Sequence, residues 1–157
     1  MNRKRRRIAA LCFLLAYPLN EMPPAWALRT PPVLQQPTLI AWDALGGLLD
    51  GCYYAVYRLD PQMVENIKRR GSAFFENEAP PLNGDERNHY SAWAQTPIPL
   101  EKTVYALTNA ACNGPYYPFD VEAAARGDTS FYSLSRNREG MWFIDPAEGL
   151  VIYRYFG

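Results

Sequence analysis

Histidine is almost absent from this sequence, which limits the chemistry that the chain can perform. His89 is its one histidine among 157 residues. A catalytic serine–histidine pair would have to use it, and a zinc site needs three or four ligands. On a helix, Asp85 and Glu86 would share a face with His89, but no second histidine or unpaired cysteine is available to complete a metal site. We therefore expect a solvated polar turn at His89, with no catalytic residue, metal or cofactor assigned.

Other common signatures are also missing. Gly46-Gly47 lacks the spacing and the basic partner of a phosphate-binding loop. None of the three cysteines belongs to a Cys-x-x-Cys unit, which argues against redox catalysis. After the first seven residues the longest basic run is Lys68-Arg69-Arg70, so a nucleic-acid partner is not expected. Carboxylate pairs can hydrolyse glycosides, but the acidic residues show no pattern that assigns such a pair.

The first 27 residues have the pattern of a secretory signal peptide. Five basic residues at positions 3–7 precede an apolar run over positions 8–16. This run is shorter than the ~20 apolar residues of a membrane-spanning helix. Ala25-Trp26-Ala27 then places small residues where a signal peptidase requires them. We therefore expect cleavage after Ala27 and export of the remaining chain.

Three alternatives to cleavage and ordinary export fit the sequence less well. A retained amphipathic anchor would interleave basic and apolar residues, whereas here the charge precedes the apolar run. A lipoprotein needs a cysteine just after the run, whereas Cys12 lies inside it. Arg5-Arg6-Arg7 is compatible with a twin-arginine route, but arginine repeats are common in ordinary signal peptides. The sequence thus favours a periplasmic or extracellular protein with no stable membrane anchor.

Removal of residues 1–27 changes the charge and the cysteine count. It takes away five of the 16 basic residues and one of the 16 acidic residues, which leaves a net charge of −4. Cys52 and Cys112 remain. An even pair in an exported chain predicts one disulfide, which would close a loop of about 60 residues and contribute roughly 4 kcal/mol. Two buried free thiols are the alternative.

The N-terminal half of the mature chain shows several local signals. Residues 28–37 carry three prolines and predict an extended arm, and residues 38–49 place apolar side chains at helical spacing, weakened by a glycine pair. Residues 52–59 are rich in β-formers and predict a strand. Asp60-Pro61 predicts the start of a helix over residues 61–70, with a basic last turn and then glycine at its end.

In the C-terminal half, the clearest signal is a β-meander. We expect strands at 130–135, 140–144 and 150–156, because short turns of Asn, Asp, Pro and Gly separate them. The preceding region predicts less regular elements: a polar loop over 76–99 with a short helix at 85–94, a helix or strand at 101–112, and a short helix at 121–126.

Together these signals predict one α+β domain over residues 38–157. Its antiparallel sheet combines the strand at 52–59 with the meander, and short helices cover one face. One segment suggests binding: Tyr116, Tyr117 and Phe119 lie between prolines, which restrict the loop before a partner arrives. The alternative, which we favour, is that these rings form a lid over the domain's own core.

The function predicted from the sequence is binding. We expect an exported, non-enzymatic protein of the envelope or secretome, such as an inhibitor, an immunity-type protein or an accessory factor, with another protein as its partner. The alternative is a small secreted hydrolase that uses carboxylates, with or without His89.

Overall fold

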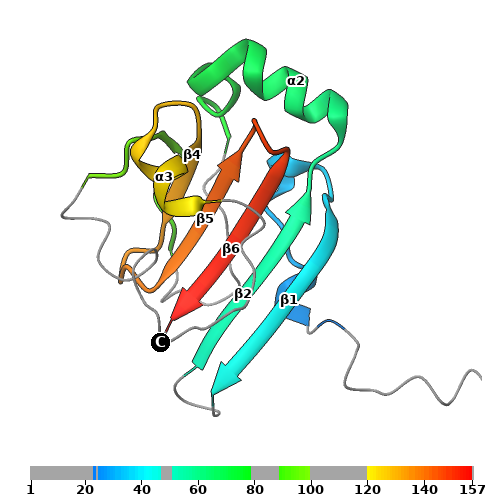
Figure 1. The fold of residues 1–157 in the computed structure, drawn as a ribbon, viewed down its shortest axis with the longest axis vertical. Helices are drawn as coiled ribbons and strands as arrows, with labels where there is room; N and C mark the ends of the chain where they lie inside the picture. The colour runs from blue at the N-terminus through cyan, green and yellow to red at the C-terminus, as the bar shows by residue number, and fades with distance from the viewer. Residues whose placement is uncertain (1–22, 24, 47–50, 79–88, 100–119, 157) are drawn as a thin grey trace, which may run out of the picture.

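The computed structural model describes residues 23, 25–46, 51–78, 89–99 and 120–156. These residues form a six-stranded antiparallel sheet with short helices beside it, in the strand order β1-β2-β6-β5-β4-β3 (Figure 1). The protein is therefore a small α+β domain, as its sequence predicts. No helix in the described residues is long and apolar enough to cross a membrane.

The predicted meander forms the centre of the sheet. Its strands are β4 (Phe131–Leu134), β5 (Gly140–Asp145) and β6 (Leu150–Phe156). β6 also pairs with β2 (Gly51–Arg58), which confirms that the strand expected at 52–59 joins the meander. Arg138 and Gly149, in the two meander turns, have positive φ angles of 65° and 66°, so each tight turn contains a left-handed residue.

Residues 38–49, which their sequence left ambiguous, form a strand over their described part: Thr38–Gly46 is the edge strand β1. The register of β1 against β2 shifts between Leu39 and Ala41, which marks a β-bulge. In a regular strand, residues three apart face opposite sides of the sheet. The bulge adds one residue, so Leu39 and Trp42 pack against the same core cluster. Helical spacing in the sequence therefore reflects a bulged strand.

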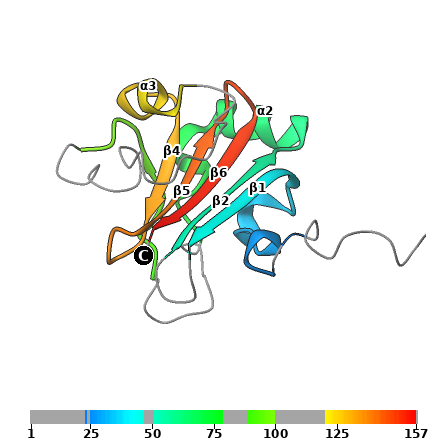
Figure 2. The same cartoon turned by 60° about the horizontal axis from the view of Figure 1, so that its bottom comes forward.

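Helix α2 (Pro61–Arg70) matches its predicted bounds, and the Asp60 side chain accepts a hydrogen bond of 2.8 Å from the Gln62 amide. It lies across one end of the sheet, with Met63 and Ile67 buried (Figure 1). A short 3-10 helix, η4 (Gly71–Phe74), continues from it. The short α3 (Val121–Arg126) also forms as predicted and lies beside β4 and β5 (Figure 2). The capping signals at Asp60 and Gly71 in the sequence thus located α2.

Both faces of the sheet are buried, whereas helices were expected to cover one. Along β5, Trp142 and Ile144 join one core cluster, whereas Met141 and Phe143 join the other. This alternation follows from the two-residue period of a strand. The central strands are therefore apolar on both sides, which explains their nearly continuous hydrophobic sequence.

The segment predicted as an extended arm packs on the sheet. It contains two 3-10 turns, η2 (Ala25–Leu28) and η3 (Pro32–Leu34), and the side chains of Ala27, Val33 and Leu34 are buried in a core cluster. Proline tolerates the first position of a helical turn, so proline-rich sequence does not require an extended chain. The prediction of an extended arm at 28–37 is therefore wrong.

The helix predicted at 85–94 is also wrong where the structure describes it. Tyr90 forms an isolated bridge with Ser135, and Ala94–Gln95 is β3, which pairs with β4. Tertiary pairing along the sheet edge thus overrides the weak local signal. Residues 85–88 and 101–112 lie outside the described residues, as do Tyr116, Tyr117 and Phe119.

Candidate functional site

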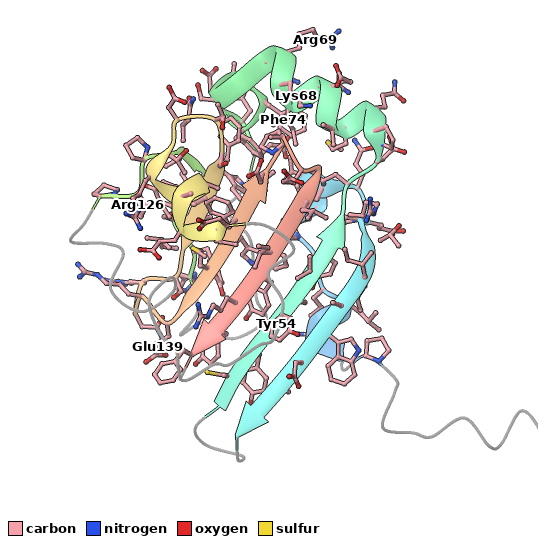
Figure 3. All side chains as sticks on the ribbon, in the orientation of Figure 1. Tyr54, Lys68, Arg69, Phe74, Arg126 and Glu139 are labelled. Atoms are coloured by element: carbon pink, nitrogen blue, oxygen red, sulfur yellow. The ribbon has the colours of Figure 1, made fainter. Side chains whose placement is uncertain are left out.

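A pocket of about 530 Å³ lies at the β3 edge of the sheet, and we call it the edge pocket. It forms where the segment before β3 meets β4 and the β4–β5 turn. Its lining residues are His89, Tyr90, Ser91, Ala92, Trp93, Ala94, Tyr132, Leu134, Ser135, Arg136 and Arg138. The turn that follows β4 lies at the opposite end of the sheet from α2, as the labels Glu139 and Arg69 show in Figure 3.

Backbone hydrogen bonds hold the two sides of the edge pocket together. The Arg136 amide donates to the His89 carbonyl at 2.7 Å, and the Ser91 amide donates to the Leu134 carbonyl at 2.8 Å. The Ser133 hydroxyl donates to the Ser91 carbonyl at 2.6 Å. Residues 89–91 are therefore fixed against β4 by main-chain groups, which leaves the His89 and Arg136 side chains at the exposed rim.

The serine hydroxyls of the edge pocket are used for structure. Ser91 Oγ accepts from the Leu134 amide at 3.2 Å and donates to the Ala92 carbonyl at 2.9 Å. Ser135 Oγ accepts from the Gly140 amide at 2.7 Å and donates to Asn137 Oδ1 at 2.6 Å. A nucleophilic serine instead gives its proton to a base such as histidine. Both hydroxyls are thus engaged in hydrogen bonds that stabilise the backbone beside the pocket and the β4–β5 turn.

The edge pocket combines an apolar wall with a basic rim. Tyr90 and Tyr132 are buried, and the half-buried Trp93 ring lies 5.1 Å from the Phe75 ring, measured between centroids. Trp93 Nε1 is buried and has no hydrogen-bond partner in the described structure. His89, Arg136 and Arg138 lie at the exposed rim, and no aspartate or glutamate is among the lining residues that the structure describes. This arrangement suits a ligand with an apolar part and a negative charge.

Two further pockets differ in character. One of about 760 Å³ lies between residues 34–38 and the start of α2, and Asp60 is the one carboxylate among its described lining residues. The other, of about 460 Å³, lies near the end of α2, where Asp128 is the one described carboxylate. Glycoside hydrolysis requires two carboxylates across the scissile bond. None of these three pockets offers that pair from described residues.

Neither a cluster of metal ligands nor a shifted pKa indicates another functional site among the described residues. Within the described ranges, no group of three or more His, Cys, Asp or Glu side chains gathers as a metal site would require. Burial raises the pKa of the Tyr57 phenol, and the neighbouring Tyr153 raises it further. Burial and the Asp43 charge raise the pKa of Tyr54. These tyrosines lie outside the edge pocket and retain their protons at neutral pH.

The candidate residues named from the sequence have mixed outcomes. His89 lies at the rim of the edge pocket, whereas Asp85 and Glu86 fall outside the described residues. Cys52 is buried on β2. Cys112 and the loop with Tyr116, Tyr117 and Phe119 also fall outside, so the disulfide and the loop surface stay predictions.

Sequence reasoning missed the pairing that creates the pocket. Trp93 and Arg136 are more than 40 positions apart, and the register of β4 against the segment before β3 brings them together. No local spacing signals that pairing. The sequence carries one weaker signal. Arg136 and Arg138 occupy alternate positions in the turn that follows β4.

No family model, curated protein or solved structure matches this chain. Its function is therefore inferred from the geometry of the edge pocket and from the sequence.

Proposed function

We propose that this chain is an exported, non-enzymatic binding protein of the cell envelope or secretome, and that the edge pocket binds another protein. The single observation that carries the proposal is the composition of that pocket. It has aromatic and aliphatic walls and a rim of His89, Arg136 and Arg138. Binding sites are commonly apolar concavities with a few polar groups that orient the ligand.

The groups around the edge pocket favour binding over hydrolysis. General acid–base catalysis needs a titratable group placed against the reacting atom, and nucleophilic catalysis needs an activated hydroxyl or thiol. Among the described residues of the pocket lining, His89 is the one candidate base, and the Ser91 and Ser135 hydroxyls already accept hydrogen bonds from main-chain amides. No observation favours the alternative of a carboxylate hydrolase.

The position of the edge pocket also supports a macromolecular partner. β3 is the last strand in the sheet order, so one wall of the pocket belongs to an edge of the sheet. An edge presents backbone groups as well as side chains to a second chain. The export pattern at residues 1–27 supports an extracytoplasmic partner.

The test fills the edge pocket by a substitution that leaves unchanged the residues whose hydrogen bonds hold the pocket together. Ala92 is exposed and lines the edge pocket, so Ala92→Trp should fill part of the cavity without crowding the core. Ala73 is an exposed alanine on η4, outside the edge pocket, so Ala73→Trp is the matched control. Immobilised unmodified chain, Ala92→Trp and Ala73→Trp are each exposed to envelope extract, and bound proteins are quantified by mass spectrometry.

We expect a protein captured in stoichiometric amount by the unmodified chain and by Ala73→Trp, with at least a tenfold loss on Ala92→Trp. Circular dichroism and melting temperature confirm that both variants remain folded. Equal capture by all three chains, or no specific capture, would contradict the proposed function.

A further inference from the structure

We infer that the larger of the two further pockets binds a neutral saccharide. It has a volume of about 760 Å³ and lies between residues 34–38 and the start of α2. We call it the glutamine pocket, because Gln35, Gln36 and Gln62 are among its lining residues. It shares no described lining residue with the edge pocket, so the inference adds a second ligand to the proposed function.

The glutamine pocket lies diagonally across the sheet from the edge pocket. β1 and β3 are the two outermost strands, and the glutamine pocket includes Thr38 at the start of β1. Phe74, which also lines it, lies at the α2 end of the sheet, whereas Glu139 marks the other end (Figure 3). The two pockets therefore leave room for two ligands at the same time.

The three glutamine side chains are the first argument. Each carboxamide has an oxygen that accepts hydrogen bonds and an NH₂ group that donates them. No protein group in the described structure bonds to these three carboxamides, whereas the fourth glutamine, Gln95, donates to the Asp128 carbonyl. A sugar hydroxyl both donates and accepts, so it matches such groups. A peptide offers a single donor and acceptor per residue, spaced along an extended chain, so the carboxamides favour a saccharide.

The backbone holds two of these carboxamides on a fixed turn. Gln35 and Gln36 have φ angles of 51° and 59°, in the left-handed region that residues other than glycine seldom adopt. The Gln35 amide donates to the Pro32 carbonyl at 3.0 Å, which fixes this residue against η3. Such conformations persist where the surrounding structure holds them, and they are common at ligand sites. A turn that is ordered before binding also lowers the entropic cost of binding.

The charge of the glutamine pocket favours a neutral ligand. Arg58 and Asp60 are its charged residues among those that the structure describes, and their charges cancel. Both lie in the unbroken described range 51–78. Asp60 Oδ1 accepts from the Gln62 amide at 2.8 Å, so the carboxylate is fixed beside the pocket. An acidic sugar would meet this carboxylate without an excess of cations, whereas a neutral sugar would not be repelled.

The floor of the glutamine pocket is apolar and continuous. Leu34, Leu59 and Met63 are 2%, 3% and 5% exposed and belong to one core cluster. The half-buried Phe74 packs against the same cluster. A pyranose ring carries hydroxyl groups around its edge and C–H groups on its faces. It can therefore bond to the carboxamides while a C–H face covers the apolar floor, as in other pockets with a few orienting polar groups.

The experiment titrates the purified exported protein with neutral trisaccharides of glucose, mannose and N-acetylglucosamine by isothermal titration calorimetry. We expect at least one of them to bind with a dissociation constant in the millimolar range or below. Gln62→Ala should weaken that saccharide about tenfold, because the hydrogen bonds of one carboxamide are lost. Glu65→Ala is the matched control, because Glu65 is exposed on α2, three positions further on, and lies outside the pocket lining.

A second pair of variants fills space instead of removing a polar group. Thr38 is exposed and lines the glutamine pocket, so Thr38→Trp should abolish saccharide binding. Ala44→Trp, at an exposed position of the same strand outside the lining, should leave it unchanged. Circular dichroism and melting temperature show whether each variant is folded, and Gln62→Ala decides the matter if Thr38→Trp does not fold.

Sialyllactose and a capped alanine tripeptide are the competing probes for an acidic sugar and for a peptide. Tighter binding of either probe than of every neutral trisaccharide would overturn the inference. Absence of binding by all three neutral trisaccharides, or equal affinity of Gln62→Ala and the unmodified chain, would do the same.

Failure of this inference can be told apart from failure of the proposed function. Ala92→Trp fills the edge pocket alone, so it should abolish protein capture and leave saccharide affinity unchanged. Thr38→Trp should have the reverse effect. Loss of saccharide binding in Ala92→Trp would overturn the assignment of the saccharide to the glutamine pocket.

Discussion

At the scale of single residues, the Tyr57 hydroxyl joins the N-terminal segment to the sheet. It donates a buried hydrogen bond of 3.0 Å to the carbonyl of Ala27, whose side chain is fully buried. The Tyr57 ring stacks on Trp142 with a centroid distance of 5.9 Å. Cleavage after Ala27, as the sequence predicts, would remove this acceptor from a buried phenol. The predicted cleavage site therefore lies directly after the residue whose carbonyl accepts this buried hydrogen bond.

This bond predicts a stability difference between two chain lengths. A chain that begins at Pro23 should be more stable than one that begins at Leu28, by about 1 to 2 kcal/mol, because the shorter chain leaves a buried donor without its acceptor. Urea unfolding of both chains at neutral pH measures the difference.

Tyr57→Phe in both chain lengths provides the control for that comparison. It removes the donor, so most of the difference should disappear, whereas Tyr53→Phe, half-buried on the same strand, should leave it intact. A length difference that survives Tyr57→Phe would show that the N-terminal turns act through other contacts.

At the scale of elements, the β4–β5 hairpin shapes the edge pocket through Gly140. A Cβ placed on Gly140 would lie 3.0 Å from Tyr90 Cζ and overlap its hydroxyl oxygen. Tyr90 lines the edge pocket, so the absence of a side chain at the start of β5 sets the position of that wall. The glycine is needed here for close approach, and not for an unusual backbone angle.

Gly140→Ala should therefore reduce both stability and binding. Overpacking of this kind costs about 1 to 3 kcal/mol in the free energy of unfolding, and the displaced Tyr90 ring should weaken ligands of the edge pocket. Gly127→Ala, where the added Cβ would lie 3.4 Å from the Ala124 carbonyl oxygen, is the matched control and should change stability much less. Equal stability of the two variants, measured by thermal unfolding, would show that the Tyr90 ring is not held at that contact.

Elements with strong local signals were predictable, and elements defined by pairing were not. Asp60 and Gly71 correctly set the bounds of α2, because a cap and a stop act within one turn of the chain. β1 was ambiguous in the sequence because its bulge near Ile40 gives Leu39 and Trp42 the spacing of a helix face. β3 has two residues, and its pairing with β4, across more than 30 positions, decides its conformation.

At the scale of the whole molecule, the fold class followed from the sequence but the site did not. Two short turns between three strand-like apolar runs predict a meander, which is the centre of the observed sheet. The edge pocket depends on how residues 89–94 lie against β4, a long-range pairing with no local signature. His89 was noticed for its rarity, and the structure places it at the rim of the edge pocket beside Arg136 and Arg138.

The measurement that tests the central claim most directly is chemical-shift mapping of the edge pocket. Uniformly ¹⁵N-labelled mature protein is titrated with the partner protein that the unmodified chain captures from envelope extract. The Trp93 indole is a useful reporter, because its buried Nε1 has no hydrogen-bond partner in the described structure. We predict that the largest shifts gather on residues 89–94 and 132–138 and include this indole. Shifts that gather on α2 or on β1, with the edge pocket unchanged, would contradict the claim that this pocket is the binding site.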